Sequence, residues 1–428
     1  MNPPPEQTQP EQTQPAGAEA GNYLLAGTVL TDGSAQADAV VAVADGRIAY
    51  VGPRGGLDEA SLPGLEELNL PPGSMILPGL VDLHCHGAVG GDFPSGDSEA
   101  ARTAVDFLHR SGTTTLLASM VTASREDLMR GLATLRQLAD EGLIAGIHSE
   151  GPFLSHARCG AQDPRYLREP DLPMLGELLA AAGGHLRTMT YAPELPGAGA
   201  VVRTLGEHGV TPSLGHTDAD ARTTAASLTE AAELLAASGL GTVSRPTVTH
   251  LFNGMPPLHH RSPGPVAACL RLARAGTIAV ELIADGAHLD PETVRTVFEL
   301  VGAANVVLVT DSMAATGLPD GDYELGPASV SVSGAVARLS DGTLAGGTLA
   351  GGTATMLDVV RRTIESGVEP AAAVLSATAV PAAIIGREHE IGSLRAGLRA
   401  DVVVVDRSFR RVLVLRAGRM LGRPAVGV

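Results

Sequence analysis

Two histidines flank a cysteine at the end of an apolar run, His84 and His86 in the segment MILPGLVDLHCH. Because side chains alternate along a strand, both imidazoles point to the same side and can reach one cation. Glu150, His216 and His250 end three later runs of the same kind. Two histidines and a carboxylate hold a divalent metal while leaving one coordination position open for water. The residue types and their spacing therefore indicate a catalytic metal centre, with Zn2+ as the expected ion.

Such a centre would supply hydrolytic chemistry. A bound Zn2+ would lower the pKa of its water to about 7, so that metal-bound hydroxide becomes available near neutral pH. The reaction also needs a group that takes up a proton and passes it to the leaving nitrogen, and Asp311 in the run NVVLVTDS can do so. A helix N-cap is the alternative for Asp311, since the segment VTDSMA would suit one. We expect Asp311 to be the general base and acid.

Eight apolar runs alternate with Ala- and Leu-rich amphipathic segments, the pattern of βαβ units around a parallel sheet. A doubly wound open sheet would alternate in the same way. The ionisable residues stand mostly at the carboxyl ends of the runs, which in a (β/α)8 TIM-like barrel form the active-site face, so their placement favours the barrel. The runs span residues 75–86, 113–120, 142–150, 186–194, 210–216, 245–253, 277–288 and 305–312.

Both ends of the chain have a different texture from the middle. Residues 1–20 form a Pro-, Gln- and Glu-rich repeat with almost nothing to bury, which predicts a disordered tail. Short β-rich runs with Asp-Gly turns follow in residues 21–74 and return in residues 385–428, which predicts one small β-sandwich domain built from both ends. Residues 75–384 would form the barrel.

Composition excludes several classes of function. The formal net charge is −17 and basic clusters are absent, which argues against nucleic acid as a partner. All 30 basic residues are arginines, so a lysine Schiff base or a carboxylated lysine between two metals is excluded. The three cysteines form no CxxC pair, and Cys85 is expected in the core. No run is long enough to cross a membrane and no secretory signal begins the chain, so we expect a soluble, cytoplasmic protein.

Several segments together resemble the N-acetylglucosamine-6-phosphate deacetylases of the amidohydrolase superfamily. They are LPGLVDLHCHG, HSEGPFL, SLGHTDA, VTHLFNGMPPLHHRSPG, IADGAHLD, VTDSMAATG and TLAGG, followed by LRAGLRADVVVVD. The resemblance implies Glu150, His216 and His250 as principal metal ligands and Asp311 as the catalytic acid and base. His84 and His86 would hold a second metal bridged by Glu150, which gives one or two divalent cations per subunit.

The same resemblance implies a phosphorylated amino sugar as the substrate, hydrolysed to glucosamine 6-phosphate and acetate. Arg261 and His288 would hold the phosphate, with Arg261 supplied by the neighbouring subunit of a homodimer. A guanidinium fork suits a phosphate dianion. The implied substrate-binding residues are Ala161, Gln162, Asn253, Gly254, Arg261, Asp285, Gly286, Ala287, His288, Leu349, Ala350 and Gly351.

Three positions depart from the family pattern. Gln162 stands where a histidine commonly orients or polarises the acetamide carbonyl, and an amide can donate a hydrogen bond but carries no charge. Gly254 replaces the usual alanine, and Gly352 replaces a serine at the end of TLAGG, where a second LAGG at 344–347 makes the alignment ambiguous. Two alternatives stay open, another amidohydrolase acting on a cyclic imide or an N-acyl amino acid, and a weakly catalytic sensor of amino-sugar phosphate.

Overall fold

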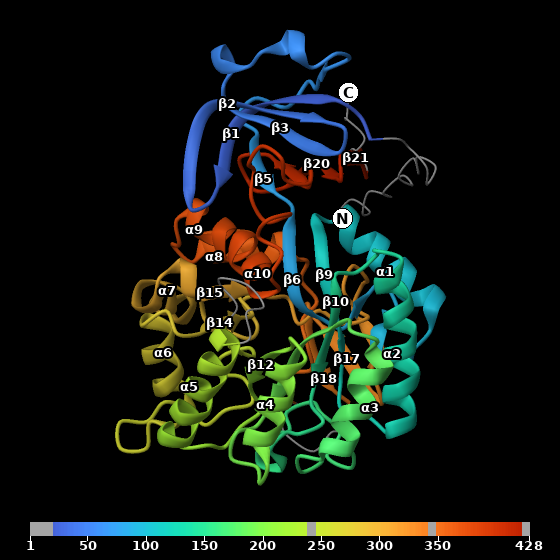
Figure 1. Cartoon of the computed structure of the whole chain (residues 1–428), viewed down its shortest axis with the longest axis vertical. Coiled ribbons are helices and arrows are strands. Elements are labelled where there is room, and N and C mark those ends of the chain that lie inside the picture. The colour runs from blue at the N-terminus through green and yellow to red at the C-terminus, as the bar shows by residue number, and fades with distance from the viewer. Residues whose placement is uncertain (1–19, 238–244, 341–347, 422–428) are drawn as a thin grey trace, which may run out of the picture.

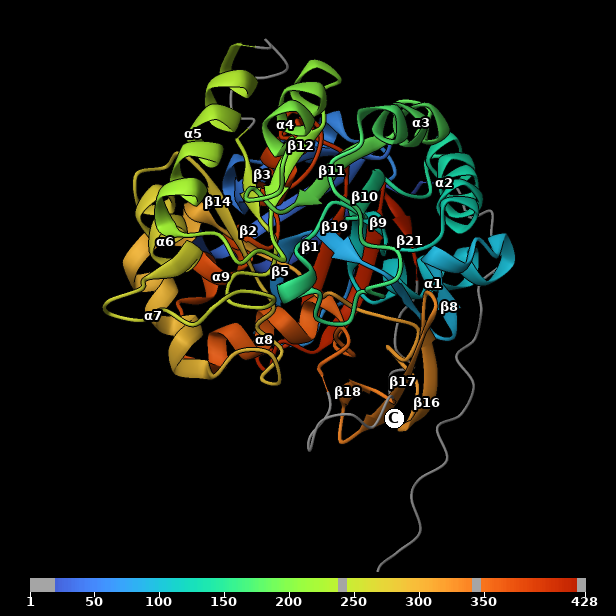
Figure 2. The same cartoon turned by 90° about the horizontal axis from the view of Figure 1, so that it is seen from below.

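The computed structural model describes residues 20–237, 245–340 and 348–421. The predicted tail therefore lies, up to residue 19, outside the described residues. Eight parallel strands form one sheet in the order β15-β14-β13-β12-β11-β10-β9-β6, with helices around it (Figure 1 and Figure 2). The predicted (β/α)8 barrel is confirmed. Its strands are β6 Leu80–Cys85, β9 Thr113–Met120, β10 Gly146–Glu150, β11 Leu186–Tyr191, β12 Thr211–Leu214, β13 Thr247–Val248, β14 Ala279–Leu282 and β15 Val306–Leu308.

The two outer strands of this order, β15 and β6, meet along the segment that follows β15. The backbone N–H of Asp311 donates to the carbonyl of His84 at 2.9 Å. Across the same seam the hydroxyl of Thr310 donates to the carboxylate of Asp82 at 2.6 Å, and both side chains are fully buried. These bonds join the ends of the sheet and fix two predicted site residues, His84 and Asp311, on neighbouring segments.

The helices cover the barrel because each carries an apolar face. In α1 the buried residues Ala101, Ala104, Val105 and Leu108 follow a helical spacing. The strands are covered on both faces, and every residue of β9 is buried. None of the described helices is both long and apolar enough to cross a membrane. The helices are α1 Ser98–Arg110, α2 Arg125–Asp140, α3 Leu172–Ala182, α4 Ala198–Glu207, α5 Ala221–Ala237, α6 Gly264–Arg274, α7 Pro291–Val301, α8 Met356–Glu365, α9 Pro370–Ser376 and α10 Ala379–Ile384.

Segments from both ends of the chain build a second sheet, at the top of Figure 1. Its order is β21-β20-β19-β5-β1-β2-β3, with β4 paired to β1. The separate β domain expected from both chain ends is thereby confirmed, while its division from the barrel at residues 74 and 385 stays a prediction. The strands are β1 Tyr23–Thr31, β2 Ser34–Ala44, β3 Arg47–Pro53, β4 Glu66–Glu67, β5 Met75–Pro78, β19 Val402–Val405, β20 Arg411–Arg416 and β21 Arg419–Met420.

A three-stranded antiparallel sheet follows β15, which the sequence analysis did not predict. It consists of β16 Gly321–Leu325, β17 Ala328–Ser333 and β18 Val336–Leu339, and it lies beside the barrel mouth in Figure 2. Its buried residues Leu325 and Val330 belong to one apolar cluster with Val121 and Met313 of the barrel. The carboxylate of Asp92, at the end of the short pair β7 Gly87–Ala88 and β8 Gly91–Asp92, accepts from the N–H of Gly326 at 3.2 Å. This sheet therefore forms one wall of the mouth.

Candidate metal centre and substrate cavity

A cavity of about 220 Å3 opens at the carboxyl ends of the barrel strands. Its position agrees with the active-site face expected for the barrel. All but one of the predicted metal and acid/base residues line it, and the remaining one, His84, lies directly behind His86. The lining residues are His86, Glu150, Gly160, Ala161, Gln162, His216, His250, Asn253, Gly254, His288, Asp311, Leu325, Thr348, Leu349 and Gly351.

One carboxylate oxygen of Glu150 meets two histidines. Its Oε1 lies 2.9 Å from Nε2 of His216 and 2.9 Å from Nε2 of His250, and these two nitrogens are 3.1 Å apart. Nδ1 of His216 lies 2.8 Å from the carbonyl oxygen of Arg158, to which it can only donate. In a neutral ring that bond leaves the lone pair on Nε2, where it faces Glu150.

The other oxygen of Glu150 faces the second pair of histidines. Its Oε2 lies 3.3 Å from Nε2 of His86 and 3.6 Å from Nε2 of His84. Oδ1 of Asp311 lies 3.2 and 3.3 Å from the same two nitrogens. On the far side of the ring, Nδ1 of His84 is 3.4 Å from Oε2 of Glu281. The carboxylate of Glu150 therefore connects both halves of the cluster.

The donor set fits a divalent cation. His84, His86 and Glu150 form one group of ligand atoms within 4.8 Å of one another, and Glu150, His216 and His250 form a second. Each Nε2 faces another Nε2 as well as a carboxylate oxygen, so one proton per ring cannot satisfy all these contacts, whereas a cation between them would. Imidazole nitrogens and carboxylate oxygens are ligands that zinc accepts.

Opposite charges inside this cluster stabilise one another, although the groups are buried. Burial alone would raise the pKa of Asp311, but His84 and His86 outweigh it and lower the pKa to about 2. Burial alone would lower the pKa of His86, but Asp311 and Glu150 outweigh it and raise the pKa to about 9. Asp311 is therefore held as a carboxylate that can accept a proton.

Three of the site residues have a strained backbone. The φ angles of His216, His250 and Asp311 are 46°, 28° and 49°. Residues other than glycine adopt this left-handed region at a cost of about 1–3 kcal/mol each, and such residues cluster at functional sites. The strain turns each side chain from the end of its strand toward the cavity, and it shows that the surrounding structure stabilises these orientations.

Gln162 directly contacts Glu150, one of the candidate metal ligands. Its Nε2 donates to Oε2 of Glu150 at 2.7 Å, while its Oε1 accepts from the N–H of Thr122 at 2.7 Å. The side chain is buried, with a relative exposure of 6%. The predicted contact of Gln162 with the acetamide carbonyl stays a prediction, and only the second hydrogen of its Nε2 remains for that contact.

The predicted phosphate-binding segment forms a compact turn around one ion pair. Nδ1 of His288 lies 2.8 Å from Oδ2 of Asp285, whose Oδ1 accepts from the N–H groups of Ala287 and His288. Burial alone would lower the pKa of His288, but Asp285 outweighs it and raises that pKa. His288 lines the cavity, so a histidine whose charged form is favoured by Asp285 lies at the cavity wall.

The other predicted substrate residues fall into two groups. Ala161, Asn253, Gly254, Leu349 and Gly351 line the cavity, whereas Arg261, Asp285, Gly286, Ala287 and Ala350 do not. A side chain at position 254 would crowd the His216 ring, since its Cβ would lie 2.9 Å from Nδ1. Arg261 is exposed, and its Nη1 lies 2.8 Å from Nε2 of His260. The second LAGG, 344–347, lies outside the described residues.

Three buried residues behind the site escaped the sequence analysis. Glu281 approaches His84, Asp82 binds the Thr310 hydroxyl, and His148 packs against the His84 ring at 4.5 Å between centroids. Each is an ionisable residue inside an apolar strand run, and that signal could have identified them. Glu194, which ends an apolar run as well, instead accepts from the Thr217 hydroxyl and has no part in the cluster.

Comparisons with known proteins agree with this geometry. The model of the amidohydrolase family matches residues 75–421. The chain is 35% identical over 325 residues to the N-acetylglucosamine-6-phosphate deacetylase of Bacillus subtilis (strain 168), covering 74% of this chain and 77% of that relative. It is 33% identical to the N-acetylgalactosamine-6-phosphate deacetylase of Escherichia coli O157:H7, covering 78% of this chain and 84% of that relative.

A solved structure extends the likeness to three dimensions. It is a variant of the N-acetyl-D-glucosamine-6-phosphate deacetylase of Mycobacterium smegmatis in complex with N-acetyl-D-glucosamine-6-phosphate. The TM-score is 0.83 at 36% identity, and the match covers 94% of this chain and 99% of that one. The chain therefore belongs to the amidohydrolase family and, within it, to the N-acetylglucosamine-6-phosphate deacetylases, which are hydrolases of an amide bond.

Proposed function

We propose that this protein hydrolyses the acetamide of N-acetylglucosamine 6-phosphate to glucosamine 6-phosphate and acetate. One observation carries the proposal. Glu150, His216 and His250 converge within 3.1 Å of one another, beside the carboxylate of Asp311, in a cavity whose wall carries His288. Members of the family that are similar to this chain are named for deacetylation of phosphorylated amino sugars.

Glu150, His216 and His250 are the residues that would hold the catalytic cation, for which we expect Zn2+. A divalent cation there would supply a Lewis acid for the acetyl carbonyl and lower the pKa of a water. His84 and His86 offer a second position that shares Glu150. Nδ1 of His216 is fixed by the Arg158 carbonyl, which orients the ring before a metal binds.

Asp311 is the group that moves the proton. Its pKa is about 2, so it is unprotonated at neutral pH and can accept a proton from the attacking water. The oxygen of that water then bonds to the acetyl carbon. Protonated Asp311 returns the proton to the nitrogen as the carbon–nitrogen bond breaks, so that the amine leaves uncharged. One water is consumed, and one acetate and one amine are formed; the second proton of the water is released to solvent when the acetic acid ionises.

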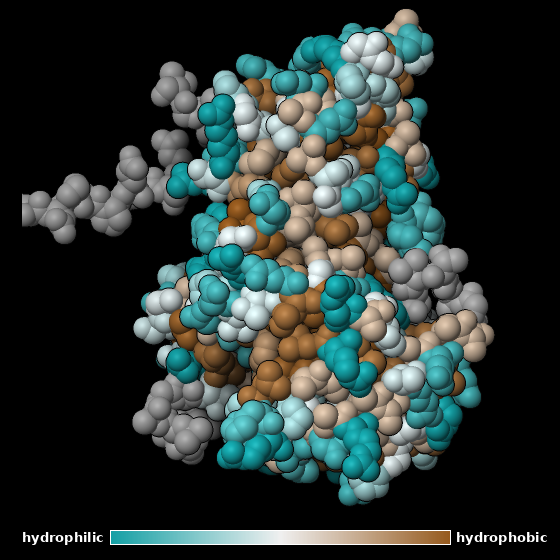
Figure 3. Space-filling model, turned by 90° about the vertical axis from the view of Figure 1, so that its left-hand side faces the viewer, coloured by the Kyte–Doolittle hydropathy of each residue, from teal (hydrophilic) through white to brown (hydrophobic). Residues whose placement is uncertain are grey.

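His288 and Arg261 are the proposed phosphate-binding residues. Asp285 raises the pKa of His288 despite its burial, which favours the charged form of the imidazole. Arg261 lies outside its own cavity, which is compatible with a contribution to the site of a second copy in a homodimer. Leu258 of the same loop is 54% exposed and Leu300 of α7 is 51% exposed, and apolar residues gather on this side of the barrel (Figure 3). Homodimer formation and a cytoplasmic location stay predictions.

N-acetylgalactosamine 6-phosphate is a second candidate substrate. The Escherichia coli O157:H7 relative is named for N-acetylgalactosamine 6-phosphate, which differs from the glucosamine compound only in the orientation of one hydroxyl. An apolar wall contact distinguishes such epimers weakly, whereas a buried polar partner distinguishes them strongly. The ratio of kcat/KM on the two compounds therefore decides between them.

The test of the proposal is acetate release by the zinc-loaded protein. We expect turnover of N-acetylglucosamine 6-phosphate with a higher kcat/KM than for unphosphorylated N-acetylglucosamine, because only the former reaches His288 with a negative charge. Equal kcat/KM on both sugars would contradict the proposal that the site binds the phosphate group. Stoichiometric binding of the phosphorylated sugar without acetate release would favour a sensor and contradict the proposed reaction.

A further inference from the structure

A second cavity, of about 270 Å3, lies at the opposite end of the barrel from the candidate metal centre. Thr115, Ala145 and Arg187 place it at the amino-terminal ends of β9, β10 and β11. It is as large as the substrate cavity, which measures about 220 Å3. Its lining contains no carboxylate, and consists of Thr115, Ala139, Gly142, Leu143, Ile144, Ala145, His185, Arg187, Arg387, Arg399 and Arg416.

Four arginines reach this cavity, but few carboxylates neutralise them. Arg399 pairs with Asp401 and with Oε1 of Glu390 at 3.2 Å. Arg387 uses the same Glu390, at 2.6 Å. Thus two carboxylates serve two of the arginines. Neither of the other two forms an ion pair with a described residue, although Asp401, which pairs with Arg399, also acts on the charge of one of them, Arg416.

Arg416 and Arg187 are those two. Within the part of the chain that the structure describes, the Arg416 guanidinium donates to two neutral carbonyls, those of Thr114 at 3.0 Å and Gly142 at 2.8 Å. Arg187 is half-buried, and its guanidinium makes no hydrogen bond or ion pair with any residue that the structure describes. Burial lowers the pKa of Arg187, and the nearby charge of Arg387 lowers it further. An unneutralised half-buried guanidinium is costly unless an anion accompanies it.

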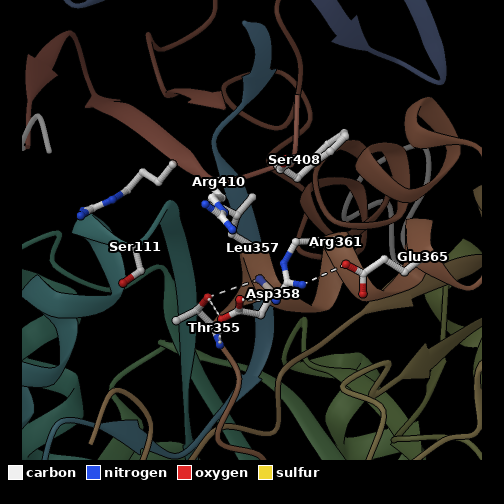
Figure 4. A pocket seen from close by; sticks show the side chains of 10 residues that line it. Ser111, Thr355, Leu357, Asp358, Arg361, Glu365, Ser408 and Arg410 are labelled. Atoms are coloured by element: carbon white, nitrogen blue, oxygen red, sulfur yellow. Dashed lines mark hydrogen bonds and ion pairs between the residues drawn. The ribbon is translucent and has the colours of Figure 1, made fainter. Parts of the chain in front are cut away.

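Another cavity is also lined by arginines, but its lining contains carboxylates that pair with one of them. The cavity in Figure 4, of about 540 Å3, is lined by Arg361, Arg410 and Arg411. There Arg361 bridges two carboxylates of the lining itself, those of Asp358 at 3.1 Å and Glu365 at 2.9 Å. The cavity that contains Arg187 has no such internal partner in its lining.

We propose that the cavity around Arg187 and Arg387 binds a small phosphate-bearing anion. Both residues also line an adjoining cavity of about 250 Å3, so the two arginines lie between two cavities. Guanidinium groups bind phosphate oxygens through paired, charge-assisted hydrogen bonds. The volume admits a sugar phosphate as well as inorganic phosphate, and the proposal does not depend on the reaction at the metal centre.

Isothermal titration calorimetry of the zinc-loaded protein tests the proposal. The ligands are inorganic phosphate, glucosamine 6-phosphate and glucosamine. Glucosamine 6-phosphate should bind at two sites, one of which is lost or weakened at least about tenfold in Arg187→Gln and Arg387→Gln, because each removes a charge-assisted contact. Tighter binding of glucosamine 6-phosphate than of phosphate identifies a sugar phosphate as the occupant, equal binding identifies phosphate itself, and glucosamine should not bind.

Two further variants make the titration decisive. Arg203→Gln makes the same charge change outside the cavity, at an exposed residue paired with Glu230, and should keep both binding events. Arg187→Lys keeps the charge and should retain weakened binding even if the glutamine variant folds poorly. The proposal is overturned if the unaltered protein shows no binding event beyond the active site, or if Arg187→Gln and Arg187→Lys both bind as the unaltered protein does.

Discussion

The candidate metal ligands form two groups that share Glu150, and these two halves differ in how closely their ligand atoms approach one another. In the first half, Oε1 of Glu150 lies 2.9 Å from both His216 and His250. In the second half, its Oε2 lies 3.3 Å from His86 and 3.6 Å from His84, and it also accepts a hydrogen bond from Gln162. The shorter contacts of Oε1 favour a cation in the first half. We therefore propose that the first half is the principal cation site and that the second half binds a cation more weakly.

Substitution of one histidine in each half should give the largest difference in metal content and in kcat/KM. His216→Ala should lose the catalytic cation, and kcat/KM should fall by at least about 10⁴-fold, because the Lewis acid and the acidified water are lost together. His86→Ala should keep one tightly bound cation per subunit. Elemental analysis after dialysis, together with acetate release, measures both effects. The ranking of the halves is wrong if His86→Ala loses the tightly bound metal while His216→Ala retains it.

Asp311 contacts only the second half, but its proposed task is proton transfer rather than metal binding. Asp311→Asn should lower kcat by about 10²–10⁴-fold and leave the principal cation in place. Asp322→Asn is the matched control, since Asp322 is exposed on β16, and it should leave kcat unchanged. A variant at position 311 with undiminished kcat would exclude Asp311 from the mechanism.

Removal of the Gln162 amide should sharpen the comparison further. Gln162→Ala leaves Oε2 of Glu150 without its donor, so the carboxylate is held less firmly and cation affinity should fall by about 10- to 100-fold. Metal titration with a competing chelator measures this affinity without recourse to activity. Exposed Gln137 on α2 gives the control Gln137→Ala. Unchanged affinity in the Gln162 variant would show that the hydrogen bond does not position Glu150.

The smallest expected effect is on the pH dependence of KM for the phosphorylated sugar. The raised pKa of His288 keeps the imidazole charged to higher pH than a free histidine, and this charge is lost as pH rises through that pKa. KM for the phosphorylated sugar should therefore increase with rising pH, and in Asp285→Asn the increase should begin at lower pH. A profile of KM against pH measures the shift. Identical profiles for both proteins would contradict the role of Asp285.

The gathering of the site residues was predictable because the carboxyl ends of barrel strands meet at one face of the barrel. The structure brings together His84, His86, Glu150, His216, His250 and Asp311, as the sequence predicted, while their roles stay a prediction. The sheet β16–β18 and the contact of Gln162 with Glu150 could not, because both depend on segments packed together from distant points of the chain. Asp82, His148 and Glu281 lie within apolar runs, where periodicity predicts a strand but not the partner of a buried polar group.

Restoration of activity to chelator-treated protein by stepwise addition of Zn2+ tests the central claim most directly. The account predicts that acetate release from N-acetylglucosamine 6-phosphate is abolished by chelation and returns as the first equivalent binds at Glu150, His216 and His250. Full acetate release from protein shown to be free of metal would contradict it.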